Sequence, residues 1–289
     1  MSKWPAMLAP FIAEYAVSKS LDIVDLARCY KCGLKYFLDR YNDREASALY
    51  SNYRGSQYYI SRHRYEFWYT RNLNGVLGKD SKMVCRRKEH LLQILNRNNI
   101  KTQVFSVMDW GGDQGQHIPD IFTERFVYEI SDAKPVEGVT KLTNMQEVRM
   151  RSFDIVMLCG VLEHCSDPKD MVRLISELKT KFLYILVPFE PFKMIRIMPD
   201  SWYRKYMKFI SHLPNLRSLV DFFTAICRLK LRLIPPFGIL MQHEHLNYFT
   251  KDSVKYLLID NGFEPIEISS FNFSFSFDPD MLVCLARRK

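Results

Sequence analysis

Two stretches of the sequence place an acid at the end of an apolar run. The run Val104–Met108 meets Asp109 and then the turn Gly111–Gly115. This order predicts a strand, a tight turn and the start of a helix, where open α/β sheets bind nucleotide-like ligands. The next run, Arg125–Glu129, ends in an acid 20 residues after Asp109. At that distance a carboxylate can accept both hydroxyls of an adenosine ribose.

A third apolar run, Phe153–Cys159, precedes Leu162-Glu163-His164. The turn after Asp109 lacks the spacing G-x-G-x-x-G of a dinucleotide fold, and no Gly-Lys-Ser/Thr follows it. A pyrophosphate or phosphate loop is therefore not predicted.

Together these stretches resemble class I S-adenosylmethionine-dependent methyltransferases, over residues 104–289. The turn resembles their motif Asp-x-Gly-x-Gly-x-Gly, with Asp113 in the place of the middle glycine. Aspartate tolerates the left-handed conformation better than most residues, and its carboxylate suits a sulfonium cation. Leu162-Glu163-His164 resembles the motif that closes the fourth strand. The resemblance implies S-adenosylmethionine as the cofactor, bound by Asp109, Gly111, Gly112, Asp113, Gly115, Gln116, Glu129, Cys159 and Leu162.

The candidates for removing a proton from the acceptor lie mainly in Met241–Phe249. This stretch resembles sugar C-methyltransferases and methyltransferases of bacterial surface-polysaccharide clusters (O-antigen or capsule). The resemblance implies proton removal by Glu244 and His245, with His243 and His164 as alternative bases; loop histidines bonded to backbone are the structural alternative. The histidine pKa near neutrality suits the role. No metal is expected to be required, because the sulfonium carbon is already activated.

The implied reaction is methyl transfer to a sugar of a bacterial surface glycan, a lipopolysaccharide or its nucleotide-sugar precursor. Gln242 replaces the aromatic residue that the C-methyltransferases carry, which favours a hydroxyl acceptor. Three alternatives stay open: a small-metabolite N- or O-methyltransferase, a sugar C-methyltransferase, and a non-catalytic cofactor-binding subunit of a glycan-synthesis complex. The net charge of +9 favours an acidic or phosphate-bearing acceptor. No nucleic-acid module is recognised.

The alternation of elements predicts a Rossmann-like α/β fold with a parallel sheet over 96–190 and 237–289. We expect strands at 104–109, 126–130, 153–159 and 182–187, and helices at 90–98, 115–122, 168–179 and 250–261. A closing antiparallel hairpin, which the resembling superfamily also has, is expected at 264–268 and 281–286.

Residues 1–95 are predicted to form a helical lid region. Ala48–Asn74 is rich in Tyr and Arg; these side chains could hold the methionine carboxylate or simply cover the domain. Cys29-x-x-Cys32-Gly33 is half of a zinc knuckle, for which Cys85 and His90 would be an unconventional second pair. Two reduced thiols are the favoured interpretation.

Residues 191–236 are predicted to be a helical insertion with nine basic and two acidic residues, interleaved with aromatic ones. A solvated cap over the active site is the simplest interpretation. The pattern also suits acidic carbohydrate, an anionic membrane surface or a partner helix, so a homo-oligomer stays open.

No apolar run reaches the ~18 residues of a membrane span, and the first residues lack the features of a signal peptide. The seven cysteines form an odd, scattered set, which suits a reducing compartment. We expect a cytoplasmic protein, peripheral to the inner membrane if the insertion binds lipid.

Overall fold

The computed structural model describes residues 2–17, 23–76, 80–195, 197–272 and 280–289. The chain divides into two compact units. Of the described residues, unit 1 contains 2–17, 23–76, 190–195 and 197–248, and unit 2 contains 80–189, 249–272 and 280–289. In the described part of the chain, no helix is both long and apolar enough to cross a membrane.

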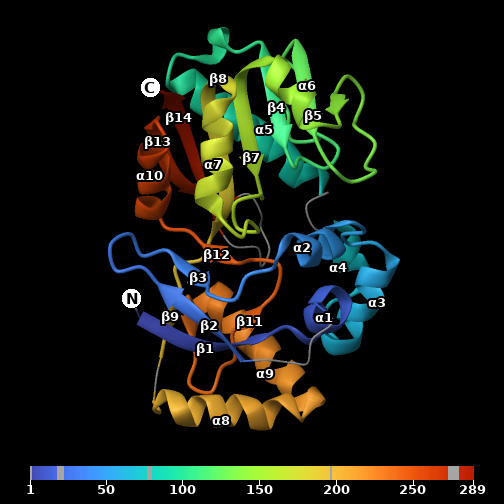
Figure 1. Ribbon diagram of the computed structural model, residues 1–289, viewed down its shortest axis with the longest axis vertical. Helices are drawn as coiled ribbons and strands as arrows, with labels where there is room; N and C mark the ends of the chain where they lie inside the picture. Colours follow the sequence, from blue (N-terminus) through green and yellow to red (C-terminus); the bar gives the residue numbers. More distant parts are fainter. Residues whose placement is uncertain (1, 18–22, 77–79, 196, 273–279) are drawn as a thin grey trace. The chain divides into compact units, whose positions relative to one another are not determined.

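Unit 2 is built on a seven-stranded sheet with the order β13-β14-β8-β7-β4-β5-β6 (Figure 1). The strands from β4 to β8 pair in parallel, and β14 is antiparallel to both of its neighbours. The predicted α/β sheet and its closing hairpin are confirmed. The strands are β4 (Ser106–Trp110), β5 (Glu124–Tyr128), β6 (Thr140–Leu142), β7 (Ser152–Cys159), β8 (Lys179–Phe189), β13 (Phe263–Phe271) and β14 (Asp280–Arg288).

Polar side chains cap the N-termini of the helices of unit 2. Asp167 accepts the N–H groups of Lys169 and Asp170 in the first turn of α7, where Pro168 has no N–H that would need an acceptor. Asp80 caps α5 in the same way, and Thr250 forms a capping box at α10. The helices are α5 (Ser81–Arg97), α6 (Met145–Met150), α7 (Pro168–Glu177) and α10 (Lys251–Asp260), with a short 3₁₀ turn at Lys101–Gln103.

The helix predicted over 115–122 is wrong. The chain makes successive turns between β4 and β5. Gly115 has a φ of +72°, outside the helical range, and Pro119 disfavours a helical conformation at Ile118. Ile118 and Phe122 are nevertheless buried, so the turns supply core side chains without a helix.

Unit 1 has its own five-stranded sheet, in the order β11-β1-β2-β3-β12. The prediction of a helical region before the main sheet is wrong for its first part, which forms three strands. Residues 237–248, predicted to belong with the main sheet, lie in unit 1 because β11 pairs in parallel with β1. The strands are β1 (Ser2–Leu8), β2 (Ile23–Arg28), β3 (Lys35–Phe37), β11 (Met241–Gln242) and β12 (Asn247–Tyr248).

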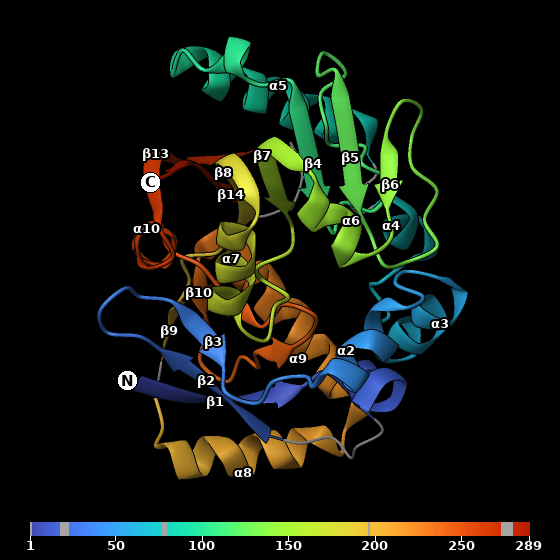
Figure 2. The same ribbon diagram turned by 45° about the horizontal axis from the view of Figure 1, so that its top comes forward.

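The helices of unit 1 come from both ends of its sequence. The insertion is helical, as predicted, and α8 packs against β1 and β2 (Figure 2). The core is rich in aromatic side chains, among them the fully buried Phe11, Phe37, Tyr58 and Tyr69. The helices are α1 (Pro10–Ile12), α2 (Asp43–Tyr50), α3 (Ser56–Tyr65), α4 (Arg71–Val76), α8 (Asp200–Ser211) and α9 (Pro214–Ile226). Unit 1 also contains two π-helical turns, Ala13–Val17 and Cys227–Leu231, and two short strands, β9 (Lys193–Met194) and β10 (Leu233–Ile234).

Candidate functional site

The three sequence motifs of unit 2 lie at one edge of its sheet. β4 pairs in parallel with β5 on one side and with β7 on the other. Their carboxyl ends therefore meet, which brings together Asp109, Glu129 and the loop 160–164. The order of strands also reverses at β4, since β5 and β6 extend the sheet in one direction and β7 and β8 in the other. Open α/β sheets bind their ligands at such a point.

The turn after β4 has the backbone of a ligand-binding loop. Gly111 and Gly115 have φ values of +65° and +72°, a region that glycine enters without strain. Asp113, which replaces a glycine of the motif, has a φ of +54°. The left-handed conformation expected for Asp113 is thus present. The Gly111 N–H donates to the Tyr128 carbonyl at 2.8 Å, which ties the turn to β5.

Gly112 and Gly115 of this turn also leave no room for a side chain. A Cβ on Gly112 would lie 2.4 Å from the carboxyl group of Asp109, and one on Gly115 would lie 2.8 Å from Val139. The turn therefore packs directly onto the end of β4 and the segment before β6.

Replacing Gly115 by alanine should lower the free energy of unfolding by about 2 kcal/mol, because a strained φ adds to the contact with Val139. Urea unfolding followed by circular dichroism would measure the loss. Gly75→Ala is the control, since a Cβ there has nothing within 4 Å; it should change stability by less than about 1 kcal/mol, in the favourable direction if at all. Equal effects of the two substitutions would contradict this description of the turn.

Asp109 is buried, and neither carboxylate oxygen has a hydrogen-bond partner among the described residues. Burial raises the pKa of Asp109 to about 8; the negative charge of Glu129 adds to the rise and Arg87 opposes it. A buried acid with no donor favours a cation beside it. The end of β4 is thus prepared for a positively charged ligand.

Because the pKa of Asp109 is higher in the folded state than its ordinary value of about 4, the folded state binds this proton more tightly. Its contribution to stability is full below pH ~4 and is lost as the pH rises towards 8. Asp109→Asn should therefore be equally stable near pH 4 and several kcal/mol more stable than wild type at pH 8, since each unit of the pKa difference corresponds to about 1.4 kcal/mol. Urea unfolding at several pH values checks this. A variant less stable at pH 8 would show that the ionised carboxylate is stabilised.

The other proposed cofactor residues surround this turn. The Glu129 carboxylate accepts the N–H of Asp113 at 3.2 Å and that of Ser131 at 2.8 Å, so it links the two loops. Gln116 accepts the N–H of Gln114. Cys159 ends β7, where burial raises the pKa of its thiol well above the ordinary value. Leu162 is fully buried in the loop that follows.

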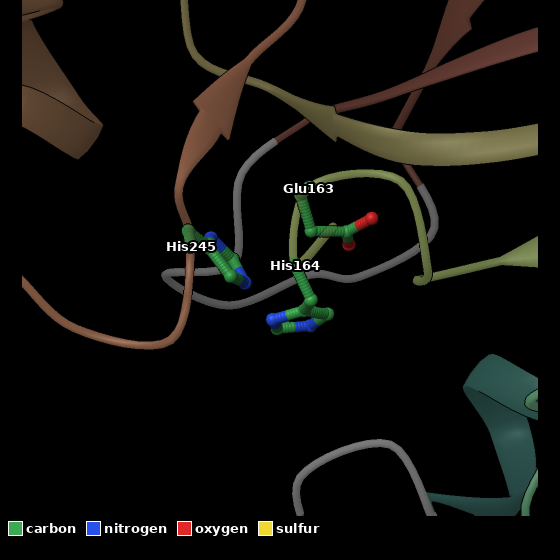
Figure 3. A group of neighbouring side chains, drawn as sticks. All are labelled: Glu163, His164 and His245. Carbon is green, nitrogen blue, oxygen red and sulfur yellow. The ribbon is translucent and has the colours of Figure 1, made fainter. Parts of the chain in front are cut away.

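Figure 3 shows Glu163 and His164 on the loop after β7. Glu163 is buried and His164 is partly exposed, and the backbone N–H of His164 donates to the Val161 carbonyl at 3.0 Å. His245, in the same figure, belongs to the segment between β11 and β12 of unit 1, where it is partly exposed.

A carboxylate–histidine pair lies inside unit 1. His243 Nε2 is 2.7 Å from Glu66 Oε1, and Tyr41 donates its hydroxyl proton to the His243 carbonyl at 2.7 Å. Burial alone would raise the pKa of Glu66, yet Arg62 and His243 lower it to about 2. Glu66 is therefore ionised and can only accept, so Nε2 carries the proton. The tautomer leaves Nδ1 as the basic atom of the ring.

Asp221 lies beside this pair. One ligand atom of each of Glu66, Asp221 and His243 is within 4.8 Å of the others. Asp221 is buried, its Oδ2 has no hydrogen-bond partner among the described residues, and burial raises its pKa to about 6. Two carboxylates near one imidazole stabilise the imidazolium that forms when the ring takes a proton.

Glu244 is held in a buried network beside the pair. Its Oε1 accepts from the Tyr58 hydroxyl and, at 2.9 Å, from Arg62. Burial raises the pKa of Glu244 to about 6. Arg62 also donates to Glu66 at 2.8 Å. Glu244 thus fixes the helix α3 to the β11–β12 segment, a structural role that sequence reasoning did not assign.

Sequence reasoning missed two polar residues of these sites. Glu66 is 177 positions from His243, and the only local signal was its i,i+4 spacing from Arg62. Arg87 of α5 is near Asp109 and His117, and its Nε is buried without a hydrogen-bond partner among the described residues. It stands in the basic run Arg86-Arg87-Lys88, where nothing distinguishes it.

The Cys-x-x-Cys pair lies in the turn between β2 and β3. The Gly33 N–H donates to the Cys29 carbonyl, with a φ of +73° at Gly33. Hydrogen bonds from the backbone of Cys32 lower the pKa of Cys29. In the described part of the chain, neither thiol belongs to a group of three or more side chains spaced to hold a metal ion.

No protein-family model matches this chain, and no curated protein matches it. Among solved structures, it is similar to 1,6-didemethyltoxoflavin-N1-methyltransferase from Burkholderia thailandensis with bound 1,6-didemethyltoxoflavin and S-adenosylhomocysteine (12% identity, covering 92% of this chain and 96% of that chain, TM-score 0.47). It is also similar to magnesium protoporphyrin IX methyltransferase from Synechocystis PCC 6803 with bound SAH (14% identity, covering 74% of this chain and 88% of that chain, TM-score 0.44). A third similar structure is the N-terminal domain of EvdMO1 in the presence of SAH and D-fucose (9% identity, covering 73% of this chain and 85% of that chain, TM-score 0.40). All three TM-scores lie below 0.5.

Proposed function

We propose that the chain is an S-adenosylmethionine-dependent methyltransferase that methylates a sugar hydroxyl of a bacterial surface glycan, a lipopolysaccharide or its nucleotide-sugar precursor. One observation carries the proposal: Asp109, the turn Gly111–Gly115 and Glu129 lie together at the carboxyl ends of adjacent parallel strands. An α/β sheet binds nucleosides at this place.

The residues of the site fit this cofactor in charge and hydrogen bonding. Asp109 is buried and no hydrogen-bond donor contacts its carboxylate among the described residues, so it would pair with the positively charged methionine ammonium or sulfonium. Glu129, at the tip of β5, would accept the ribose hydroxyls. Arg87 would hold the methionine carboxylate, because the half-buried Arg87 is near Asp109 and its buried Nε lacks a partner among the described residues.

When bound, S-adenosylmethionine supplies an activated methyl carbon. The chain must then orient the acceptor and remove the proton of its hydroxyl. His243 suits this better than the other candidates, because Glu66 fixes its tautomer and Asp221 stabilises its charged form. Nδ1 of His243 would take the proton, while Glu66 acts through the opposite nitrogen as a positioning residue.

Gln242 supports an oxygen acceptor over a carbon one. This residue is fully buried, and its amide donates to the Asp39 carbonyl at 2.8 Å. It therefore belongs to the framework of unit 1 and supplies no aromatic surface to a keto-sugar. The net charge of +9 favours acceptors that carry phosphate or carboxylate.

The test is transfer of an isotope-labelled methyl group from S-adenosylmethionine to nucleotide-linked sugars, free sugars and lipopolysaccharide fragments, with NMR mapping of the product. Label on a sugar oxygen is expected. Label on a ring carbon would indicate a sugar C-methyltransferase, and label only on small N- or O-acceptors would overturn the sugar assignment. Cofactor binding without transfer to any acceptor would favour the non-catalytic subunit.

A further inference from the structure

Helix α9 is amphipathic with its polar face inward. Its buried side chains include Arg217, Ser218, Asp221 and Thr224. After the exposed Pro214 and Asn215 of its first turn, its exposed side chains are apolar and recur every three or four residues along one face: Leu216, Leu219, Phe223 and Ile226. Leu219 and Phe223 are each 55% exposed. A surface helix of a water-soluble domain normally buries its apolar face and exposes its polar one. The exposed apolar face of α9 therefore indicates a site of association.

Helix α8, which precedes α9, exposes a second apolar stripe. Trp202 is 66% and Phe209 62% exposed, and their spacing of seven residues places them on one face of the helix. Lys205 lies between them, with its ammonium 5.8 Å from the centre of the Trp202 ring. The opposite face, with Met207 and Ile210, is buried in the core of unit 1.

We define the α8–α9 surface by the large apolar side chains that these helices and their connection expose: Trp202, Phe209, Leu213, Leu216, Leu219, Phe223 and Ile226. Figure 1 shows that the two helices follow one another within unit 1. Surfaces of this kind in water-soluble proteins mark sites of association with a partner or a lipid surface.

The charges around these helices are positive. Lys193, Lys205, Lys208, Lys230 and Arg232 are exposed. Glu190 and Asp221 are buried, so Asp200 is the one acidic side chain that the described residues of 190–238 expose. A basic rim around exposed Trp, Phe and Leu side chains is complementary to a surface that is negative outside and apolar beneath.

We propose that the α8–α9 surface docks unit 1 onto an anionic lipid surface, with the apolar side chains in the headgroup region and the lysines at the phosphates. Trp and Phe favour this depth, and lysine side chains reach outward from it. The absence of a spanning helix in the described part of the chain is compatible with such contact, which needs only a face.

The test is co-sedimentation of the full chain with vesicles of phosphatidylcholine alone and of phosphatidylcholine with phosphatidylglycerol. Wild type should bind only the anionic vesicles, and less as salt is added. Lys205→Gln with Lys208→Gln should weaken binding on the order of 20-fold. Leu219→Ser with Phe223→Ser should weaken it at least about tenfold.

Matched control variants alter similar exposed residues of unit 2. Lys251→Gln with Lys255→Gln on α10, and Met150→Ser with Ile259→Ser, should leave vesicle binding unchanged. Circular dichroism shows whether each variant is folded, and since the substituted side chains are exposed, we expect all of them to fold.

Two outcomes would overturn the proposal. One is no binding to anionic vesicles, or binding that both surface variants retain. The other is self-association of wild type in sedimentation velocity, abolished by Leu219→Ser with Phe223→Ser, in the absence of vesicle binding. That result would assign the surface to a second copy of the chain.

Discussion

Replacing Arg62 with methionine is expected to lower the free energy of unfolding by about 3–5 kcal/mol, because it leaves buried carboxylates without their cation. Arg62 bonds Glu66 at 2.8 Å and Glu244 at 2.9 Å. Its guanidinium lies 4.0 Å from the centre of the Tyr69 ring and 5.0 Å from that of Phe11. Methionine keeps much of the side-chain volume of arginine and none of its charge. The loss of unfolding free energy therefore reports mainly the electrostatic contribution of Arg62.

Urea unfolding measures this loss, and Arg64→Met supplies the matched control. Arg64 stands two positions away on the same helix and pairs with Glu14, but both side chains are largely exposed. Such a pair contributes roughly 0–1 kcal/mol. Equal losses for the two variants would show that the buried network does not hold unit 1 together.

The effect of Arg62→Met should also depend on pH. The pKa of Glu66 is held at about 2 in the folded protein, below its ordinary value of about 4.3. The stability that Glu66 contributes is therefore present above pH ~4 and lost as the pH falls towards 2. The difference between wild type and Arg62→Met should shrink over that interval, and a constant difference would contradict the assignment to Glu66.

His243→Gln should lower kcat on the order of 10³-fold and leave S-adenosylmethionine binding unchanged, since a general base acts on the acceptor and contributes 10²–10⁴-fold. Glu66→Gln should give a smaller loss of kcat and a shifted pH profile, because the tautomer of His243 is no longer fixed. Steady-state kinetics with the acceptor found by the labelling assay would measure both.

The controls for this prediction are His245→Gln and His164→Gln. Sequence resemblance favoured His245 with Glu244, whereas the hydrogen bonds of unit 1 favour His243 with Glu66. A kcat that collapses in His245→Gln and survives in His243→Gln would return the base to the position that the resemblance implied, and would make the Glu66–His243 pair structural.

The main sheet could be predicted because its signals are local. Four of the parallel strands, β4, β5, β7 and β8, contain a short apolar run, and Phe182–Val187 is buried throughout, as a central strand requires. The left-handed conformation at Asp113 could be expected because Asp113 stands where the resembling motif has a glycine, and aspartate tolerates this conformation. The helix predicted between β4 and β5 was wrong because Gln116–Phe122 has the apolar spacing of a helix, whereas Gly115 and Pro119 oppose one.

Unit 1 could not be predicted because its contacts are distant in sequence. Met7 pairs with Met241, and Tyr248 pairs with Lys35. The strands involved are as short as two residues, too short to show a period of two. The basic and aromatic residues of the insertion indicated its helices, but the direction in which the apolar face of α9 points depends on packing and inverts the usual rule.

The cofactor site is tested most directly by titration calorimetry with S-adenosylmethionine and S-adenosylhomocysteine, on wild type, Glu129→Ala and Glu124→Ala. Glu124 lies exposed at the opposite end of the same strand. We expect wild type and Glu124→Ala to bind with a dissociation constant on the order of 1 μM, and Glu129→Ala to bind at least about tenfold more weakly. Folded wild-type protein that binds neither compound would contradict the proposal that this turn holds S-adenosylmethionine.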